Sequence, residues 1–167
     1  MKKGIIVCAF PATGKTTAIC QADKLGIVAC DSDSEDHHWI DRNVPREERE
    51  ERPDWIQSYV AHLQKATAEN DFVFASTHDV VREALVANEV PFVVVYPTKD
   101  QKEEFLSRVN NRSTGLCGEF GLNLLTKMWD IWLEQMESQS ACGRVILQNQ
   151  QYLADVLEDI KREGEIL

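Results

Sequence analysis

The chain has 167 residues, of which 43% are hydrophobic and 28% are charged. This composition is typical of one folded globular domain and excludes disordered or fibrous classes. The formal net charge of −10 argues against a long nucleic-acid partner or an anionic membrane, so an anionic ligand needs a local cationic pocket. The first apolar run stops at Phe10, too short to span a membrane, and we expect a cytoplasmic protein.

Short apolar runs rich in β-branched residues predict five strands, separated by segments with helical spacing. Strands that alternate with helices favour an α/β fold with a mainly parallel sheet. Within the longest predicted helix, Trp129 and Trp132 follow the apolar stripe, which assigns both to packing. The predicted strands are 3–9, 26–30, 71–75, 91–96 and 144–147, and the predicted helices are 15–25, 53–69, 80–88, 99–111, 118–139 and 151–163.

Segment 9–16, AFPATGKT, follows the first predicted strand and opens the first predicted helix. It matches the phosphate-binding pattern G-x-x-x-x-G-K-[ST], except that Ala9 replaces the first glycine. In such a P-loop, backbone N–H groups and the helix dipole face the phosphates. Lys15 would contact the β and γ phosphates, and the Thr16 hydroxyl would hold magnesium. The residues predicted to bind the nucleotide here are Ala12, Thr13, Gly14, Lys15, Thr16 and Thr17.

The second predicted strand ends in Asp31-Ser32-Asp33. Because side chains alternate along an extended chain, both carboxylates point to the same side at the carboxyl edge of the sheet, where open α/β folds bind ligands. The third strand ends in Ser76 and Thr77 instead of an aspartate, so the metal carboxylate must come from elsewhere. We assign Asp31 to magnesium and Asp33 to catalysis and the acceptor, although their roles as metal ligand and base remain interchangeable at this point.

Together these motifs resemble the group of P-loop kinases that contains the nucleoside monophosphate kinases, shikimate and gluconate kinases and polynucleotide kinase. DSDS at 31–34, Y-x-x-H at 59–62, STHDVVREAL at 76–85 and VYP at 95–97 also resemble small bacteriophage proteins described as adenylate-kinase-like or nucleotide-kinase-like. The resemblance covers nearly the whole chain, but only the P-loop motif is highly specific.

This resemblance implies a single domain over 1–167 with the three-layer α/β fold of P-loop NTPases. The sheet would have five parallel strands in the order 2-3-1-4-5. ATP and magnesium would bind at the P-loop, with an acceptor-binding region at about 34–70 and a small lid at about 105–121.

Phosphoryl transfer needs cations beyond the P-loop lysine, because negative charge is spread over the transferring oxygens. Arg108 and Arg112 lie four residues apart, so a helix through both would put them on one face. Related kinases carry their lid arginines in this region. We expect both to be catalytic. By the same resemblance, Arg82 would bind the acceptor phosphate, with Arg42 as a second candidate, and Asn149 would contact the adenine.

The sequence therefore predicts an ATP- and magnesium-dependent kinase of a small acceptor, which we expect to be a nucleoside or deoxynucleoside monophosphate. One alternative is a hydroxyl acceptor, either a shikimate-like or gluconate-like metabolite or a polynucleotide 5′-hydroxyl, with Asp33 as the general base. Another is a non-catalytic switch that only binds nucleotide. The identity of the acceptor, the oligomeric state and the pathway do not follow from the sequence.

Overall fold

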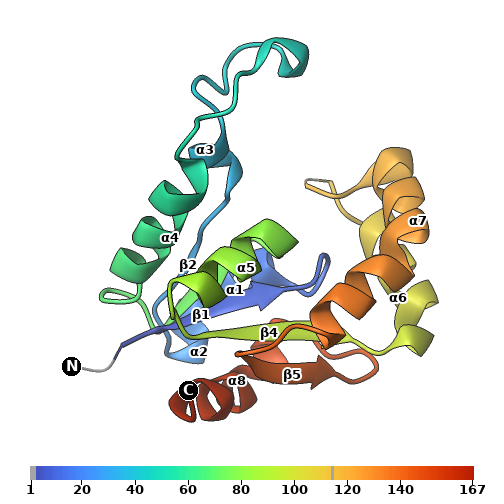
Figure 1. The fold of residues 1–167 in the computed structure, drawn as a ribbon. Coiled ribbons are helices and arrows are strands. Elements are labelled where there is room, and N and C mark those ends of the chain that lie inside the picture. The colour runs from blue at the N-terminus through green and yellow to red at the C-terminus, as the bar shows by residue number, and fades with distance from the viewer. Residues whose placement is uncertain (1–2, 114) are drawn as a thin grey trace.

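Five strands form one parallel sheet in the computed structural model, which describes residues 3–113 and 115–167. The strands are β1 (Ile5–Ala9), β2 (Ala29–Asp31), β3 (Phe72–Ala75), β4 (Phe92–Pro97) and β5 (Gly143–Leu147). All neighbours pair in parallel in the order β2-β3-β1-β4-β5, so the predicted topology is confirmed (Figure 1).

Burial along the strands follows their position in the sheet. Every residue of the central strands β3 and β4 is buried, as expected for strands covered on both faces. At one edge, β5 alternates between buried and exposed residues, and at the other edge no residue of β2 is fully buried. The uninterrupted apolar runs therefore lie in the middle of the core, and the edge strands β2 and β5 are only partly buried.

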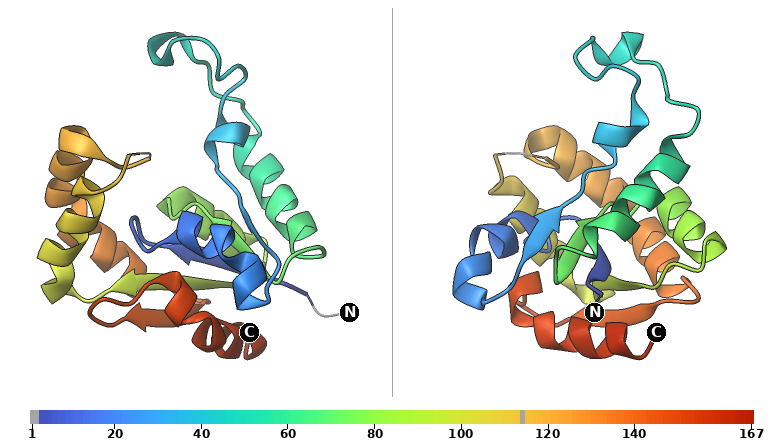
Figure 2. Two further views of the ribbon diagram at one scale, coloured as in Figure 1. Left: turned by 180° about the vertical axis from the view of Figure 1, so that it is seen from behind. Right: turned by 90° about the vertical axis from the view of Figure 1, so that its left-hand side faces the viewer.

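Helices cover both faces of the sheet, which gives the molecule three layers. In Figure 1 and from behind in Figure 2, α4, α5 and α7 lie on one face, and α1 and α8 lie on the other. The helices are α1 (Lys15–Cys20), α2 (Ala22–Leu25), α3 (Glu35–His38), α4 (Trp55–Ala66), α5 (Asp79–Ala87), α6 (Lys102–Asn110), α7 (Gly118–Glu137) and α8 (Leu157–Glu165), together with 3₁₀ turns η1 (Arg46–Glu48), η2 (Lys99–Gln101) and η3 (Leu153–Asp155).

The second strand begins three residues later than predicted. Gly26 has a φ of +64°, in the left-handed region that favours glycine, and it ends α2. Next, the Val28 N–H donates to the Asp71 carboxylate at 2.8 Å, and the Asp71 N–H donates to the Val28 carbonyl at 2.7 Å. These bonds fix the chain before β2, so regular pairing starts only at Ala29 and continues through Asp31.

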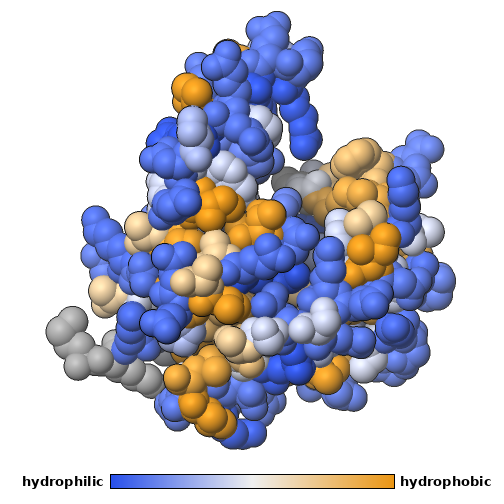
Figure 3. All heavy atoms as spheres, viewed as in Figure 1, coloured by the Kyte–Doolittle hydropathy of each residue, from blue (hydrophilic) through white to orange (hydrophobic). Residues whose placement is uncertain are grey.

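A polar arm, residues 39–54, rises beside the carboxyl edge of the sheet (Figures 1 and 3). The highly charged segment 45–53 lies within it and is mostly exposed. At its base the His38 ring stacks on Trp39 at 4.3 Å and on Trp55 at 4.4 Å between ring centroids. An antiparallel bridge joins Trp39 to Glu51, so the base of the arm is held by aromatic stacking and backbone pairing.

Across from the arm, α6 and α7 pack together and carry the predicted lid, of which Thr114 lies outside the described residues. Trp129 is buried against Phe10 and Phe105, and Trp132 packs on Phe10, so the assignment of both tryptophans to packing is confirmed. No helix in the described part of the chain is long and apolar enough to cross a membrane.

Candidate active site

The P-loop is a tight turn between β1 and α1. Ala12 and Gly14 both have positive φ angles, 62° and 94°. Left-handed residues beside right-handed ones curl a backbone so that its N–H groups face a common centre, which is the geometry of anion-binding loops. The Thr13 hydroxyl donates to the Phe10 carbonyl at 2.8 Å and closes the turn. The motif predicted from sequence therefore has the left-handed turn geometry that is typical of anion-binding loops.

Phe10 anchors this loop to the core. Its ring meets those of Phe105, Trp129 and Trp132 edge to face, with centroids 5.4–6.2 Å apart. Its backbone N–H donates to the Val95 carbonyl at 2.8 Å, which extends the sheet by one bond. Because these contacts come from α6, α7 and β4, the P-loop is supported by the same helices that carry the lid.

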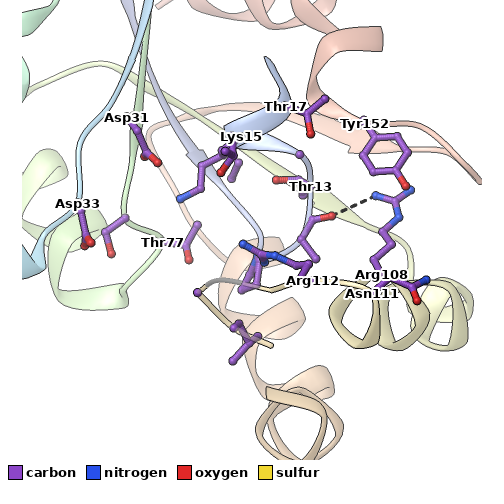
Figure 4. A pocket seen from close by; sticks show the side chains of 18 of the residues that line it. Thr13, Lys15, Thr17, Asp31, Asp33, Thr77, Arg108, Asn111, Arg112 and Tyr152 are labelled. Atoms are coloured by element: carbon purple, nitrogen blue, oxygen red, sulfur yellow. Dashed lines mark hydrogen bonds between the residues drawn. The ribbon is translucent and has the colours of Figure 1, made fainter. Parts of the chain in front are cut away.

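A cavity of about 1040 Å³ opens over the P-loop. Thr13, Lys15 and Thr16 line it from the loop, and Asp31 and Asp33 line it from the end of β2. Figure 4 shows Lys15, Asp31, Asp33 and Thr77 on one side of the pocket and Arg108, Asn111 and Tyr152 on the other. The predicted alternation after β2 is confirmed, since Asp31 and Asp33 are exposed and Ser32 between them is buried.

Tyr59 of α4 ties together the two strand ends that line this cavity. Its hydroxyl donates to the Ser32 carbonyl at 2.5 Å and accepts from the Ser76 N–H at 3.0 Å. Tyr59 is fully buried, and burial raises the pKa of its phenol, so the hydroxyl keeps its proton. The Ser32 carbonyl lies between Asp31 and Asp33, so this one hydroxyl positions both carboxylates relative to β3.

Replacing Tyr59 by phenylalanine should lower the free energy of unfolding by about 1–3 kcal/mol, because two backbone groups lose their partner. Thermal unfolding measures the effect. Tyr96→Phe, another buried tyrosine outside this cavity, is the control and should lose less stability. An unchanged free energy of unfolding in Tyr59→Phe would contradict the role of this hydroxyl in joining the ends of β2 and β3.

Arg108 is held among aromatic rings rather than free in the cavity. The guanidinium lies 4.4 Å from the Phe105 ring centroid and 3.9 Å from that of Tyr152. It donates to the Ala12 carbonyl of the P-loop at 3.3 Å and to the Gln151 carbonyl at 2.8 Å, and it pairs with Glu104. With 8% of its side chain exposed, Arg108 joins α6, the P-loop and the loop after β5.

Arg112 differs from Arg108, although both lie on the lid side of the cavity. Within residues 3–113 and 115–167, no hydrogen bond or ion pair engages its guanidinium. Arg112 lines the cavity at the start of the loop that contains Gly115, whose φ is +68°. Because no described residue holds this guanidinium, it can turn toward an anion at little cost.

Three predicted site residues lie outside the main cavity. Arg82 is buried on α5 and faces a second, smaller cavity. Arg42 lies on the arm, where it is exposed and pairs with Asp36. Asn149 accepts a bond from the Gln101 amide at 3.0 Å and is not part of the cavity wall.

Sequence reasoning assigned no role to Tyr59, Tyr152 or Glu104, although Tyr59 belongs to the Y-x-x-H pattern of the resemblance. Tyr152 covers the P-loop so closely that a Cβ added to Gly14 would lie 2.9 Å from its ring. Glu104 pairs with Arg108 and accepts the Gln150 N–H at 3.1 Å. The spacing of Glu104 and Arg108, four residues on one helix, is a sequence signal for their pair, but nothing local indicates the partners of the two tyrosines.

Comparison with known proteins shows likeness in structure alone, since no family model and no curated protein matches the sequence. The tunicamycin resistance protein of Deinococcus radiodurans is 14% identical over 98% of this chain and 95% of its own, with a TM-score of 0.55. A sugar kinase from Janibacter sp. HTCC2649 is 17% identical over 99% and 96%, with a TM-score of 0.53. A gluconokinase from Sinorhizobium meliloti 1021 is 14% identical over 99% and 95%, with a TM-score of 0.50. The chain therefore shares the α/β fold of these solved structures.

Proposed function

We propose that this protein is a kinase that transfers the γ-phosphoryl group of ATP, with magnesium, to a small acceptor. The observation that carries the proposal is the composition of one cavity wall. It combines the P-loop lysine Lys15 and the strand-end carboxylates Asp31 and Asp33 with Arg112. Among residues 3–113 and 115–167, no side chain or carbonyl pairs with the Arg112 guanidinium. The kinases among the structural neighbours, named for a sugar and for gluconate, support phosphoryl transfer to a small molecule.

The residues of the cavity fit a magnesium-bound nucleotide. The left-handed turn at Ala12 and Gly14 suits the phosphates, and the volume of about 1040 Å³ exceeds what a nucleotide alone requires. Thr16 and Asp31 both line the cavity and offer the oxygen ligands that magnesium prefers. ATP bound there supplies the phosphoryl group, whose bond to the β–γ bridging oxygen breaks as a bond to an acceptor oxygen forms, leaving ADP.

The chain's own residues then have separate tasks. Lys15 neutralises the β and γ phosphates from the base of α1, and Arg112 stabilises the charge on the transferring oxygens from the lid. Arg108 of α6 fixes the positions of the P-loop and of the loop after β5 relative to this helix, through its bonds to Ala12 and Gln151. Tyr59 keeps Asp31 and Asp33 at the cavity wall.

The acceptor that we propose is a nucleoside or deoxynucleoside monophosphate. A phosphate acceptor needs no base, because it is already anionic. A hydroxyl acceptor is the second candidate, and the exposed Asp33 carboxylate favours it. Asp33 uses one oxygen to accept the Glu35 N–H at 3.0 Å, which leaves the other free to take the proton of an alcohol.

The test is ADP release by the purified protein with ATP and magnesium, against a panel of acceptors. The panel contains ribo- and deoxynucleoside monophosphates, shikimate, gluconate and 5′-hydroxyl oligonucleotides. Stimulation by a monophosphate that disappears on chelation of magnesium supports the main proposal. Stimulation by a hydroxyl compound, lost in Asp33→Asn, supports the second candidate. Tight ATP binding without turnover on any acceptor would favour a nucleotide-binding switch.

A further inference from the structure

Glu35 is a third carboxylate on the wall of the main cavity, beside Asp31 and Asp33. It begins α3, and its backbone N–H donates to one Asp33 oxygen at 3.0 Å. Because 40% of its side chain is exposed, a ligand in the cavity can reach the carboxylate. Neither the sequence motifs nor the proposed mechanism gives this residue a task.

One oxygen of the Glu35 carboxylate is fixed by the polar arm. The Trp39 indole N–H donates to Oε2 at 2.9 Å, and Nη1 of Arg49 lies 3.5 Å from the same oxygen. Nε of Arg49 in turn donates to the Val44 carbonyl at 3.2 Å. Within residues 3–113 and 115–167, no hydrogen bond engages the other oxygen, Oε1. Glu35 therefore offers a charged acceptor atom on an anchored side chain.

The anchor of Glu35 is itself well supported. The His38 ring lies between those of Trp39 and Trp55, and the antiparallel bridge joins Trp39 to Glu51. A group held in this way loses little conformational freedom when it binds a ligand, so one hydrogen bond from it can carry specificity.

Two buried hydroxyl groups on the same wall have no partner. Ser32 is 4% exposed and Ser34 is 5% exposed, and both line the main cavity. The Ser32 hydroxyl has no hydrogen bond, and the Ser34 hydroxyl does not cap α3 or bond to any other described residue. Buried polar groups usually have a partner, so these hydroxyls indicate that a polar ligand completes this wall.

The charge of the wall determines which part of an acceptor it can face. Among the described residues that line the main cavity, the lysine and arginines are Lys15 on the P-loop and Arg108 and Arg112 on the lid side. Three carboxylates on the opposite wall would repel an anionic group. They suit a hydrogen-bond donor, and both acceptor candidates named above carry hydroxyl groups.

We propose that Glu35 is a specificity-determining residue, which accepts a hydrogen bond from a hydroxyl group of the acceptor through its free Oε1. This inference rests on the proposed kinase function and deepens it. The substrate class narrows to acceptors with a hydroxyl group besides the reacting one, which favours ribonucleotides and polyhydroxylated metabolites over their deoxy forms. A site that binds a hydroxyl discriminates against an analogue without it, because the carboxylate then loses its partner.

The test uses Glu35→Gln, which removes the charge with almost no change in shape. Glu48→Gln makes the same change at an exposed position of η1 on the arm, outside the cavity, and is the matched control. Acceptors are compared in pairs that differ by one kind of hydroxyl: ribonucleoside monophosphates against their 2′-deoxy and 3′-deoxy forms, 5′-hydroxyl RNA against DNA, and gluconate against 2-deoxygluconate. ADP release gives kcat/KM, and tryptophan fluorescence gives binding without turnover.

We expect at least one hydroxylated acceptor to have a kcat/KM roughly ten- to a hundredfold above that of its deoxy form, as one hydrogen bond to a charged group would give. Glu35→Gln should lower kcat/KM for the hydroxylated member and leave the deoxy member nearly unchanged, whereas a merely structural role would lower both alike. Glu48→Gln should keep the full preference. Equal kcat/KM within every pair, or an unchanged preference in Glu35→Gln, would overturn the inference.

Trp39→Phe is a second variant, which keeps an aromatic ring but removes the N–H donor to Oε2. It should weaken the preference less than Glu35→Gln does, because the pair with Arg49 remains. Thermal unfolding checks that both variants fold. A full preference in Trp39→Phe would contradict the anchoring of the carboxylate by the arm.

Failure of this inference and failure of the proposed kinase function give different results. Turnover with equal use of hydroxylated and deoxy acceptors would leave the kinase standing and remove the role of Glu35. Hydroxyl-selective fluorescence changes that Glu35→Gln abolishes, without ADP release, would leave the role of Glu35 standing and remove the kinase proposal. Absence of binding for both members of every pair would contradict both.

Discussion

Replacing Lys15 by alanine should lower kcat for phosphoryl transfer roughly a hundred- to thousandfold. Lys15 begins α1 and lines the main cavity directly after the left-handed turn at Gly14. Its ammonium group adds to the field of the backbone N–H groups and the helix dipole at the phosphates. Removing a preorganised charge that faces a developing anion typically costs a factor of this size. Single-turnover ADP formation at saturating ATP is the measurement.

Lys24→Ala is the control for this variant, because it removes the same charge from an exposed position at the end of α2. It should leave kcat unchanged. If Lys15→Ala kept full turnover, the P-loop would not be the donor site, and the proposed mechanism would fail with it. A different result would favour a nucleotide-binding switch: no turnover in the unmodified protein, together with a loss of nucleotide affinity in Lys15→Ala.

The parts of the fold and site that the sequence predicted correctly depend on local chain chemistry. The P-loop is encoded in eight consecutive residues that follow a buried strand. Exposure of both Asp31 and Asp33 follows from alternation along an extended chain. The strand order β2-β3-β1-β4-β5 depends on contacts between distant segments. Its prediction came from the resemblance to P-loop kinases.

The parts that sequence reasoning could not supply depend on contacts between distant residues. The bonds from Tyr59 to Ser32 and Ser76 join segments 27 and 17 residues apart. The bonds of Arg108 to Ala12 and Gln151 span 96 and 43 residues. Helical spacing predicted Arg108 and Arg112 on one helix face, but α6 ends at Asn110, so Arg112 lies in the loop beyond the helix. The spacing also does not show that, among the described residues, only Arg108 has side-chain partners.

The same limit applies to Arg82. Its position after β3, through the resemblance, indicated a cation near the acceptor. Its sequence neighbours do not show that Met136 of α7 and Gln139, just beyond this helix, contact it. Because Arg82 is buried, it lines the second, smaller cavity and not the main one. The sequence shows that an arginine is present, whereas the packing of α5 and α7 determines which cavity its guanidinium faces.

The difference between the two lid arginines leads to the second large effect. Arg112→Ala should lower kcat about a thousandfold and leave the KM for ATP nearly unchanged. Arg112 has no partner to lose within the described residues, so its removal should cost little stability. An arginine that contacts the transferring phosphoryl group acts mainly in the transition state, and its loss appears in kcat. Arg162→Ala on α8, an exposed arginine outside the cavity, is the control.

Arg108→Ala should behave in the opposite way. It removes bonds to Ala12 and Gln151 and the packing between Phe105 and Tyr152, so thermal stability and ATP affinity should both fall. Arg112→Lys should recover part of the lost turnover, because it restores the charge without the planar fork. A kcat loss in Arg108→Ala with normal stability, together with full activity in Arg112→Ala, would reverse the two roles and make Arg108 the catalytic arginine.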